Sequence, residues 1–105
     1  MTTKMEFVPP LSNENDPLDP FNPSYLCDGV QGYAIANQGE VWIPWIAADV
    51  EGDGRVGKLL DNLAEHCCIV NITSKRLLGM LLRRGWKPRQ VDTPDGPVDV
   101  WRLNK

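Results

Sequence analysis

The fold of this chain is decided by the stretch VWIPWIAADVEGDGRVGKLLDNL, residues 41–63. Its first eight residues are almost all apolar and predict a buried strand, and a glycine-rich turn follows at residues 51–58. The leucines after the turn predict a helix. Glycines let a backbone approach a ligand closely, and the first amides of a helix have no internal partner. Strand, glycine turn and helix start therefore predict an anion site, and the anion we expect there is a pyrophosphate.

A second strand is predicted just before this stretch. Val30–Ala36 is apolar and β-prone, and Asn37-Gln38-Gly39 supplies a turn into Glu40–Ala48. Together they predict an antiparallel hairpin. Pro44 lies within the second strand and has no N–H to donate. Its position must therefore be an edge, a bulge or a place where the sheet parts.

The rest of the chain alternates helices and strands. In order, the sequence predicts a helix with its apolar stripe at Val56, Leu59, Leu60 and Leu63, a short buried strand Cys67–Ile72, a helix capped by Thr73 or Ser74 and stopped by Gly85, and a hairpin of Trp86–Asp92 with Val98–Leu103. This order indicates an α+β fold, an α/β sandwich with a mixed, mostly antiparallel sheet flanked by two helices.

At 105 residues the chain has the length of one domain. Five of its nine prolines fall within residues 1–25, and prolines at that density prevent a helix. Residues 1–28 are therefore expected to be an extended arm, with a short strand at Lys4–Val8. Residues 29–105 are expected to be the domain itself.

Composition narrows the class of protein. A net charge of −3 argues against a general nucleic-acid-binding protein. No apolar segment approaches the roughly 18 residues of a membrane helix, and the first residues lack the pattern of a signal peptide. The three cysteines do not make a disulfide framework, and the adjacent Cys67 and Cys68 are expected to be core thiols. We expect a cytoplasmic protein with no membrane or nucleic-acid partner and no metal.

The sequence of the glycine turn partly matches two known motifs, but each match lacks an essential residue. Gly52-x-x-x-x-Gly57-Lys58 has the spacing of a P-loop, but Leu59 stands where a Ser or Thr must bind magnesium. Asp49-x-Glu51-x-Asp53-Gly54 resembles the start of a calcium loop, but its twelfth position is Leu60 instead of a bidentate Glu. Neither a nucleotide-hydrolysing site nor a calcium site is therefore expected.

The turn and its surroundings resemble the acetyl-CoA-binding segment of the GNAT N-acetyltransferase superfamily. That family's motif is Gln/Arg-x-x-Gly-x-Gly/Ala followed by a leucine-bearing helix, and residues 51–60 occupy this register. The resemblance extends over residues 30–103 in the order hairpin, turn, helix, strand, helix ending in Gly-aromatic, and final hairpin. It implies a small, N-terminally trimmed member that transfers an acetyl group from acetyl-CoA to an amine of a protein or small molecule.

The resemblance also implies which residues form the site. Backbone groups of Ile46, Ala47 and Ala48 would pair with the pantetheine arm. The pyrophosphate would be held by the segment Gly52, Asp53, Gly54, Arg55, Val56, Gly57 and Lys58, with Ser74 in the place of the Asn that often opens the second helix. Glu40, eleven residues before Glu51, would be the general base, and Asp49 is a second candidate for that role.

The chain departs from the family pattern at three positions. Glu51 replaces the usual Gln or Arg, Val56 replaces a small residue, and Leu81 stands where a Tyr often serves as general acid. These departures leave open an alternative, a non-catalytic module of the same fold that binds coenzyme A or a protein partner. Such a trimmed form would suit an accessory or phage-encoded protein. In either case a homodimer could supply the acceptor wall.

Other polar residues carry weaker expectations. His66 is expected at a helix end and not in catalysis. A basic cluster lies between residues 75 and 89, and it favours a solvated helix face over a contact with the 3′-phosphate of coenzyme A, an acidic partner or nucleic acid. Its members are Lys75, Arg76, Arg83, Arg84, Lys87 and Arg89.

Overall fold

A computed structural model describes residues 6–11, 25–70, 72 and 74–103. The elements in chain order are β1 (Tyr25–Cys27), β2 (Val30–Asn37), β3 (Glu40–Ala48), α1 (Arg55–Asn62), β4 (Cys67–Val70), α2 (Lys75–Arg83), β5 (Trp86–Thr93) and β6 (Gly96–Leu103). They form one six-stranded sheet in the order β1-β2-β3-β4-β6-β5. Only β3 and β4 run parallel, and the other four pairs are antiparallel. The predicted α+β fold with a mixed, mostly antiparallel sheet is therefore confirmed.

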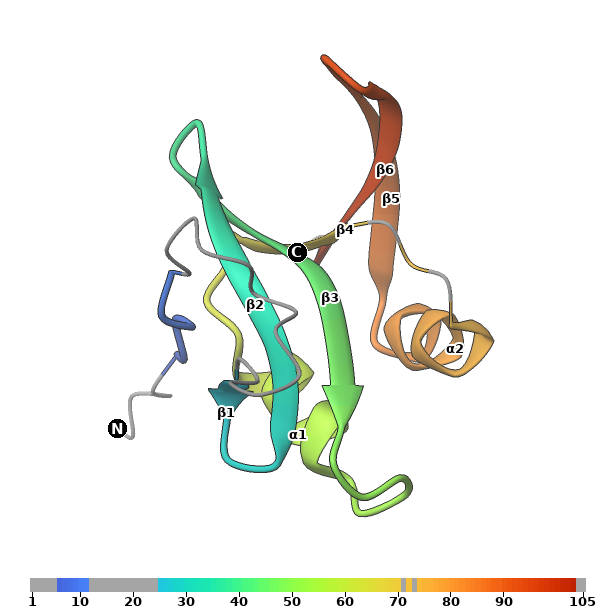
Figure 1. The fold of residues 1–105 in the computed structure, drawn as a ribbon. Helices are drawn as coiled ribbons and strands as arrows, with labels where there is room; N and C mark the ends of the chain where they lie inside the picture. The colour runs from blue at the N-terminus through green and yellow to red at the C-terminus, as the bar shows by residue number, and fades with distance from the viewer. Residues whose placement is uncertain (1–5, 12–24, 71, 73, 104–105) are drawn as a thin grey trace, which may run out of the picture.

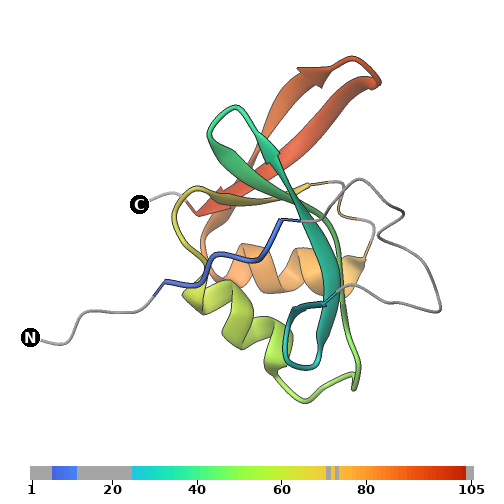
Figure 2. The ribbon, with the colours of Figure 1, turned by 60° about the vertical axis from the view of Figure 1, so that its left-hand side comes forward.

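Both helices cover the same face of the sheet, so the molecule has two layers (Figures 1 and 2). Leu59 and Leu60 of α1 and Leu81 of α2 are at most 4% exposed and belong to one apolar cluster with the inward side chains of the sheet. Arg84 Nε donates to Asp61 Oδ1 at 2.8 Å and joins the ends of the two helices. Burial of the leucine stripes is what fixes the helices on this face.

A smaller cluster lies on the other face of the sheet. It consists of Trp42, Cys68, Val70 and Val100, none more than 8% exposed. Cys67 points to the helix side and Cys68 to this one, and both thiols are at most 1% exposed. The prediction that these cysteines are core residues is confirmed, and all three cysteines are free thiols.

The sheet begins earlier than the sequence indicates. β1 pairs with β2 through Tyr25 and Cys27, within the segment predicted as an arm. The sequence did not predict this strand because three residues are too few to show a periodic pattern. Most of that arm, including part of the predicted strand Lys4–Val8, lies outside the described residues. Phe7 makes one parallel bridge with Leu63 and packs against the main core, so residues 6–11 run beside the end of α1 (Figure 2).

The boundaries of α2 follow ordinary capping rules. Ser74 caps α2, since its Oγ accepts the Leu77 N–H at 3.3 Å, and the alternative cap Thr73 lies outside the described residues. Gly85, at φ +80°, follows the end of α2 as predicted. No helix in the described part of the chain is long and apolar enough to cross a membrane.

Cys68 should make the stability of the fold sensitive to alkaline pH. Burial, and then the neighbouring Glu40 carboxylate, raise the pKa of this thiol from its ordinary value of 9.0 to about 12. Above pH 9 the unfolded chain releases this proton while the folded chain keeps it, so rising pH favours unfolding. The slope contributed approaches about 1.4 kcal/mol per pH unit. We expect chemical denaturation between pH 8 and 11 to show a steeper loss of stability for the wild type than for Cys68→Ala. Parallel curves would contradict this assignment.

Candidate functional site

β3 and β4 separate halfway along β3. The two strands pair at Val41–Cys67, Trp42–Cys68 and Ile43–Ile69, and there the pairing ends. β3 continues to Ala48, still bonded to β2 along its other edge. One edge of its second half therefore has no strand beside it among the described residues.

A β-bulge lies at the point of separation. Tyr33 pairs with Trp45 and Ile35 pairs with Trp42, so β3 has one residue more than β2 between these two pairs. Pro44 lies in this irregular segment, where a missing N–H costs no ladder bond. The prediction that Pro44 marks a bulge or a parting of the sheet is confirmed, because both occur there.

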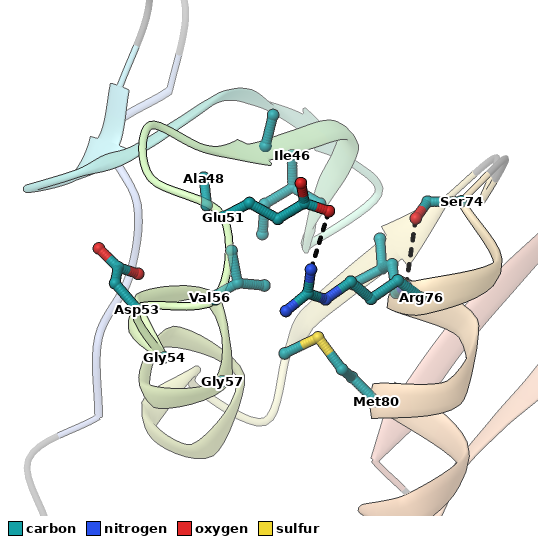
Figure 3. Close-up of a pocket in the computed structure, with 13 residues that line it drawn as sticks. Ile46, Ala48, Glu51, Asp53, Gly54, Val56, Gly57, Ser74, Arg76 and Met80 are labelled. Atoms are coloured by element: carbon teal, nitrogen blue, oxygen red, sulfur yellow. Dashed lines mark hydrogen bonds and ion pairs between the residues drawn. The ribbon is translucent and has the colours of Figure 1, made fainter.

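A cavity of about 450 Å³ opens beside the free half of β3 (Figure 3). Its walls come from β3, the glycine turn and the first turns of both helices. The lining residues are Ile46, Ala47, Ala48, Glu51, Gly52, Asp53, Gly54, Val56, Gly57, Ser74, Arg76, Leu77 and Met80. A second hollow of about 150 Å³ shares Ile46, Ser74 and Leu77 with it and extends between the parted strands, against Ile43 and Ile69. The two hollows together lead from the helix side to the gap in the sheet.

The turn between β3 and α1 depends on two glycines. Gly52 and Gly54 have φ of +87° and +83°, which other residues adopt only with strain. The first main-chain bond of α1 runs from the Lys58 N–H to the Gly54 carbonyl oxygen at 3.1 Å. The amides of residues 55–57 therefore have no acceptor within the helix. The Arg55 amide donates to Asp53 Oδ1 at 3.0 Å, and the other two amides belong to Val56 and Gly57, which line the cavity.

α2 also begins at the cavity. Ser74 and Arg76, from its N-terminal end, line the cavity opposite the glycine turn (Figure 3). Two helix N-termini, each equivalent to about half a positive charge, thus border one space. Gly57 is buried, and a Cβ there would lie 2.8 Å from Arg84 Nη2, so its small size lets the two helices meet closely.

Nine of the eleven predicted ligand-contacting residues line this cavity. Arg55 and Lys58 do not. Arg55 is turned away toward the β1–β2 turn, where it pairs with Asp28 at 2.8 Å and also with Asp53 at 3.0 Å. The Arg55 guanidinium is therefore already paired with two carboxylates.

Sequence reasoning missed part of the wall. Arg76, Leu77 and Met80 line the cavity from α2 and were not predicted as ligand-contacting residues. They fall at spacings of one, three and four residues, which place them on one helix face. The sequence spacing alone could predict that these residues share a helix face. That this face borders the glycine turn is seen only in the folded structure.

Glu40, the predicted base, is not among the cavity residues. It begins β3 at the end remote from the turn, roughly 25 Å of strand before Ala48. Both of its carboxylate oxygens accept from Arg102, with Nη2 to Oε1 at 2.7 Å, and Trp42 Nε1 donates to it at 3.5 Å. The contacts of Glu40 therefore fit a structural ion pair.

The remaining polar candidates also lie outside the cavity lining. Asp49 accepts from the Tyr25 hydroxyl at 3.2 Å and from the Gln31 amide. His66 is exposed, and its carbonyl oxygen accepts the Val41 amide at 3.0 Å. Within the described residues, no group of three or more His, Cys, Asp or Glu side chains could hold a metal ion.

The Glu40–Arg102 pair should contribute to stability and not to ligand affinity. Glu40→Gln leaves the partly buried Arg102 guanidinium without its anionic partner, so we expect a loss of about 1 kcal/mol and a melting temperature lower by roughly 4–8 °C. Calorimetry should show this shift, and Arg102→Gln should reproduce it. A Glu40→Gln variant that melts with the wild type would contradict the structural role.

From β2 onward the element order agrees with the expected one, and five of the seven residues predicted at the glycine turn line one cavity. Both findings rest on the geometry of this chain. The chain matches no protein-family model, no curated protein and no solved structure.

Proposed function

We propose that the chain binds acetyl-CoA in this cavity and transfers the acetyl group to an amine of a protein or small molecule, as a small GNAT-type acyltransferase. The observation that carries the proposal is the parting of β3 and β4 beside a cavity that reaches the glycine turn. An extended amide-bearing arm needs a free strand edge, and a pyrophosphate needs free amides. The cavity offers both along one wall.

Each part of the ligand would be bound by a different group of residues. The unpaired edge of Ile46–Ala48 would exchange main-chain hydrogen bonds with the pantetheine amides, as an added strand does. The Val56 and Gly57 amides, at the positive end of α1, would hold the pyrophosphate. Ser74 would add a hydroxyl from the opposite wall.

The bound thioester would supply an electrophilic carbonyl at the gap between the strands. The acceptor amine would attack that carbonyl carbon, the carbon–sulfur bond would break, and the thiolate would leave as the amine loses its proton. Main-chain donors at the edge of β3 would stabilise charge on the carbonyl oxygen. In this proposal Glu40 would take the amine proton only through intervening water, because it lies outside the cavity lining and Arg102 donates to both of its oxygens.

The proton source for the thiolate would be solvent. Leu81, at the position of the family's tyrosine, is 0% exposed and packs in the main core. The residue of that helix turn that lines the cavity is Met80, which has no proton to donate.

One observation favours a second function, a non-catalytic module that binds coenzyme A or a protein partner. Among the described cavity residues the acidic side chains are Glu51 and Asp53, and each is paired with an arginine. No unpaired base therefore faces the cavity in the part of the chain described. An extended peptide could equally pair with the free edge of β3. Under either function the protein would act in the cytoplasm, and a second copy could complete the acceptor wall.

Calorimetric titration with acetyl-CoA and with coenzyme A tests the ligand. We expect saturable binding to the wild type and at least tenfold weaker binding to Ala48→Phe, because a ring at Ala48 would fill the cavity beside the strand edge. Ala36→Phe is the matched control, since Ala36 is an exposed residue of β2 opposite Val41, outside the cavity. Its affinity should equal that of the wild type.

Two results would count against the proposal. No heat of binding at hundreds of micromolar would remove the ligand, and equal affinity of both variants would place the ligand elsewhere. A thiol-release assay over a panel of amines and peptides then separates the enzyme from the binding module. Turnover unchanged in Glu40→Gln would remove Glu40 as the base.

A further inference from the structure

One ion pair spans the mouth of the cavity. Arg76 Nη1, from the first turn of α2, donates to Glu51 Oε1 of the glycine turn at 2.8 Å (Figure 3). Both side chains line the cavity and are largely exposed, at 58% and 81%. The pair is therefore a bridge between the two walls that solvent can reach.

The guanidinium lies against the glycine turn itself. A Cβ built on Gly52 would come within 3.6 Å of Arg76 Nη2. Arg76 is also the one cationic side chain among the described cavity residues, since Arg55 is held by Asp28 and Asp53 outside it. A phosphate at the turn would therefore meet Arg76 before any other cation of the site.

Glu51 already occupies the partner position that such a phosphate would take. A single exposed carboxylate–arginine pair is weak, because water solvates both ions well. A phosphate offers more charge and a bidentate partner for a planar guanidinium, and it gains from the helix amides nearby. Exchange of one anion for the other is therefore favourable, and Glu51 can turn into solvent.

We propose that Arg76 binds a phosphate of the ligand and that Glu51 is an internal competitor for it, so that the cavity selects phosphate-bearing ligands. This inference rests on the proposed function and names how that site recognises its ligand. A ligand that lacks phosphate cannot recover the contact that Glu51 loses. Besides the proposed amide contacts of Val56 and Gly57, one side chain of α2 therefore discriminates coenzyme A from pantetheine.

Titration calorimetry with coenzyme A and with pantetheine on matched variants tests this exchange. Glu51→Gln removes the competitor and should bind coenzyme A about two- to fivefold more tightly. Arg76→Gln should bind it about tenfold more weakly. Neither change should alter the affinity for pantetheine. Glu51→Gln should tighten coenzyme A binding by a clearly smaller factor in the Arg76→Gln background than in the wild type, because without Arg76 only the repulsion by the carboxylate is removed and no competition for the guanidinium.

Asp61→Asn is the matched control. Asp61 also pairs with an arginine of α2, Arg84, at 2.8 Å, and it lies outside the cavity lining. Its substitution changes the net charge by the same amount, so its affinity for coenzyme A should match that of the wild type. A gain equal to that of Glu51→Gln would reduce the effect to overall charge and overturn the exchange.

Other outcomes are equally decisive. If Glu51→Gln tightens binding by the same factor with and without Arg76, Glu51 merely repels the ligand and the exchange is wrong. If Glu51→Gln weakens binding, Glu51 contacts the ligand and the proposal also fails. If both variants bind coenzyme A with the affinity of the wild type, this inference is overturned but the proposed function stands. Absence of binding in the wild type and every variant removes both.

Discussion

The site depends on a β-bulge in β3, where this strand has one residue more than the β2 segment that it pairs with. As far as Ile43 this strand is paired on both edges, and its side chains are buried on both faces of the sheet. The bulge against β2 and Pro44 lie where the ladder to β4 stops. β4 ends at Val70, while β3 runs on to Ala48. A regular, fully paired strand would have left β3 with no free edge beside the cavity.

Helix placement turns this gap into a charged environment. α1 begins directly after the turn that leaves β3, and α2 begins shortly after β4, so both N-termini lie at the gap. Gly57 and Arg84 allow the helices to pack closely enough to share the cavity. The leucine stripes hold them on one face of the sheet. Positive helix ends therefore face the cavity as a consequence of topology, in a chain whose net charge is −3.

The sequence predicted those parts of the molecule whose signal is local. β3 has the predicted bounds, and the glycine turn and the apolar stripe of α1 form as expected, because apolar periodicity and positive-φ glycines act over a few residues. β1 was missed because three residues carry no period. The wall formed by Arg76 and Met80 was missed because it depends on contacts between segments distant in sequence. Arg55 was expected at the ligand for its charge, but Asp28, twenty-seven residues earlier, holds it elsewhere.

Departures from the family motif have limited weight here for a physical reason. Recognition by strand edges and helix amides uses the main chain, which a substitution at Val56 leaves in place. The charge at Glu51 is a different matter, because an unpaired carboxylate beside the turn would repel an anion. Arg76 cancels that charge across the cavity mouth at 2.8 Å. An anion site in an acidic chain thus requires that its own carboxylates be paired, and a pair that is exposed and weak is one that a stronger anion can replace.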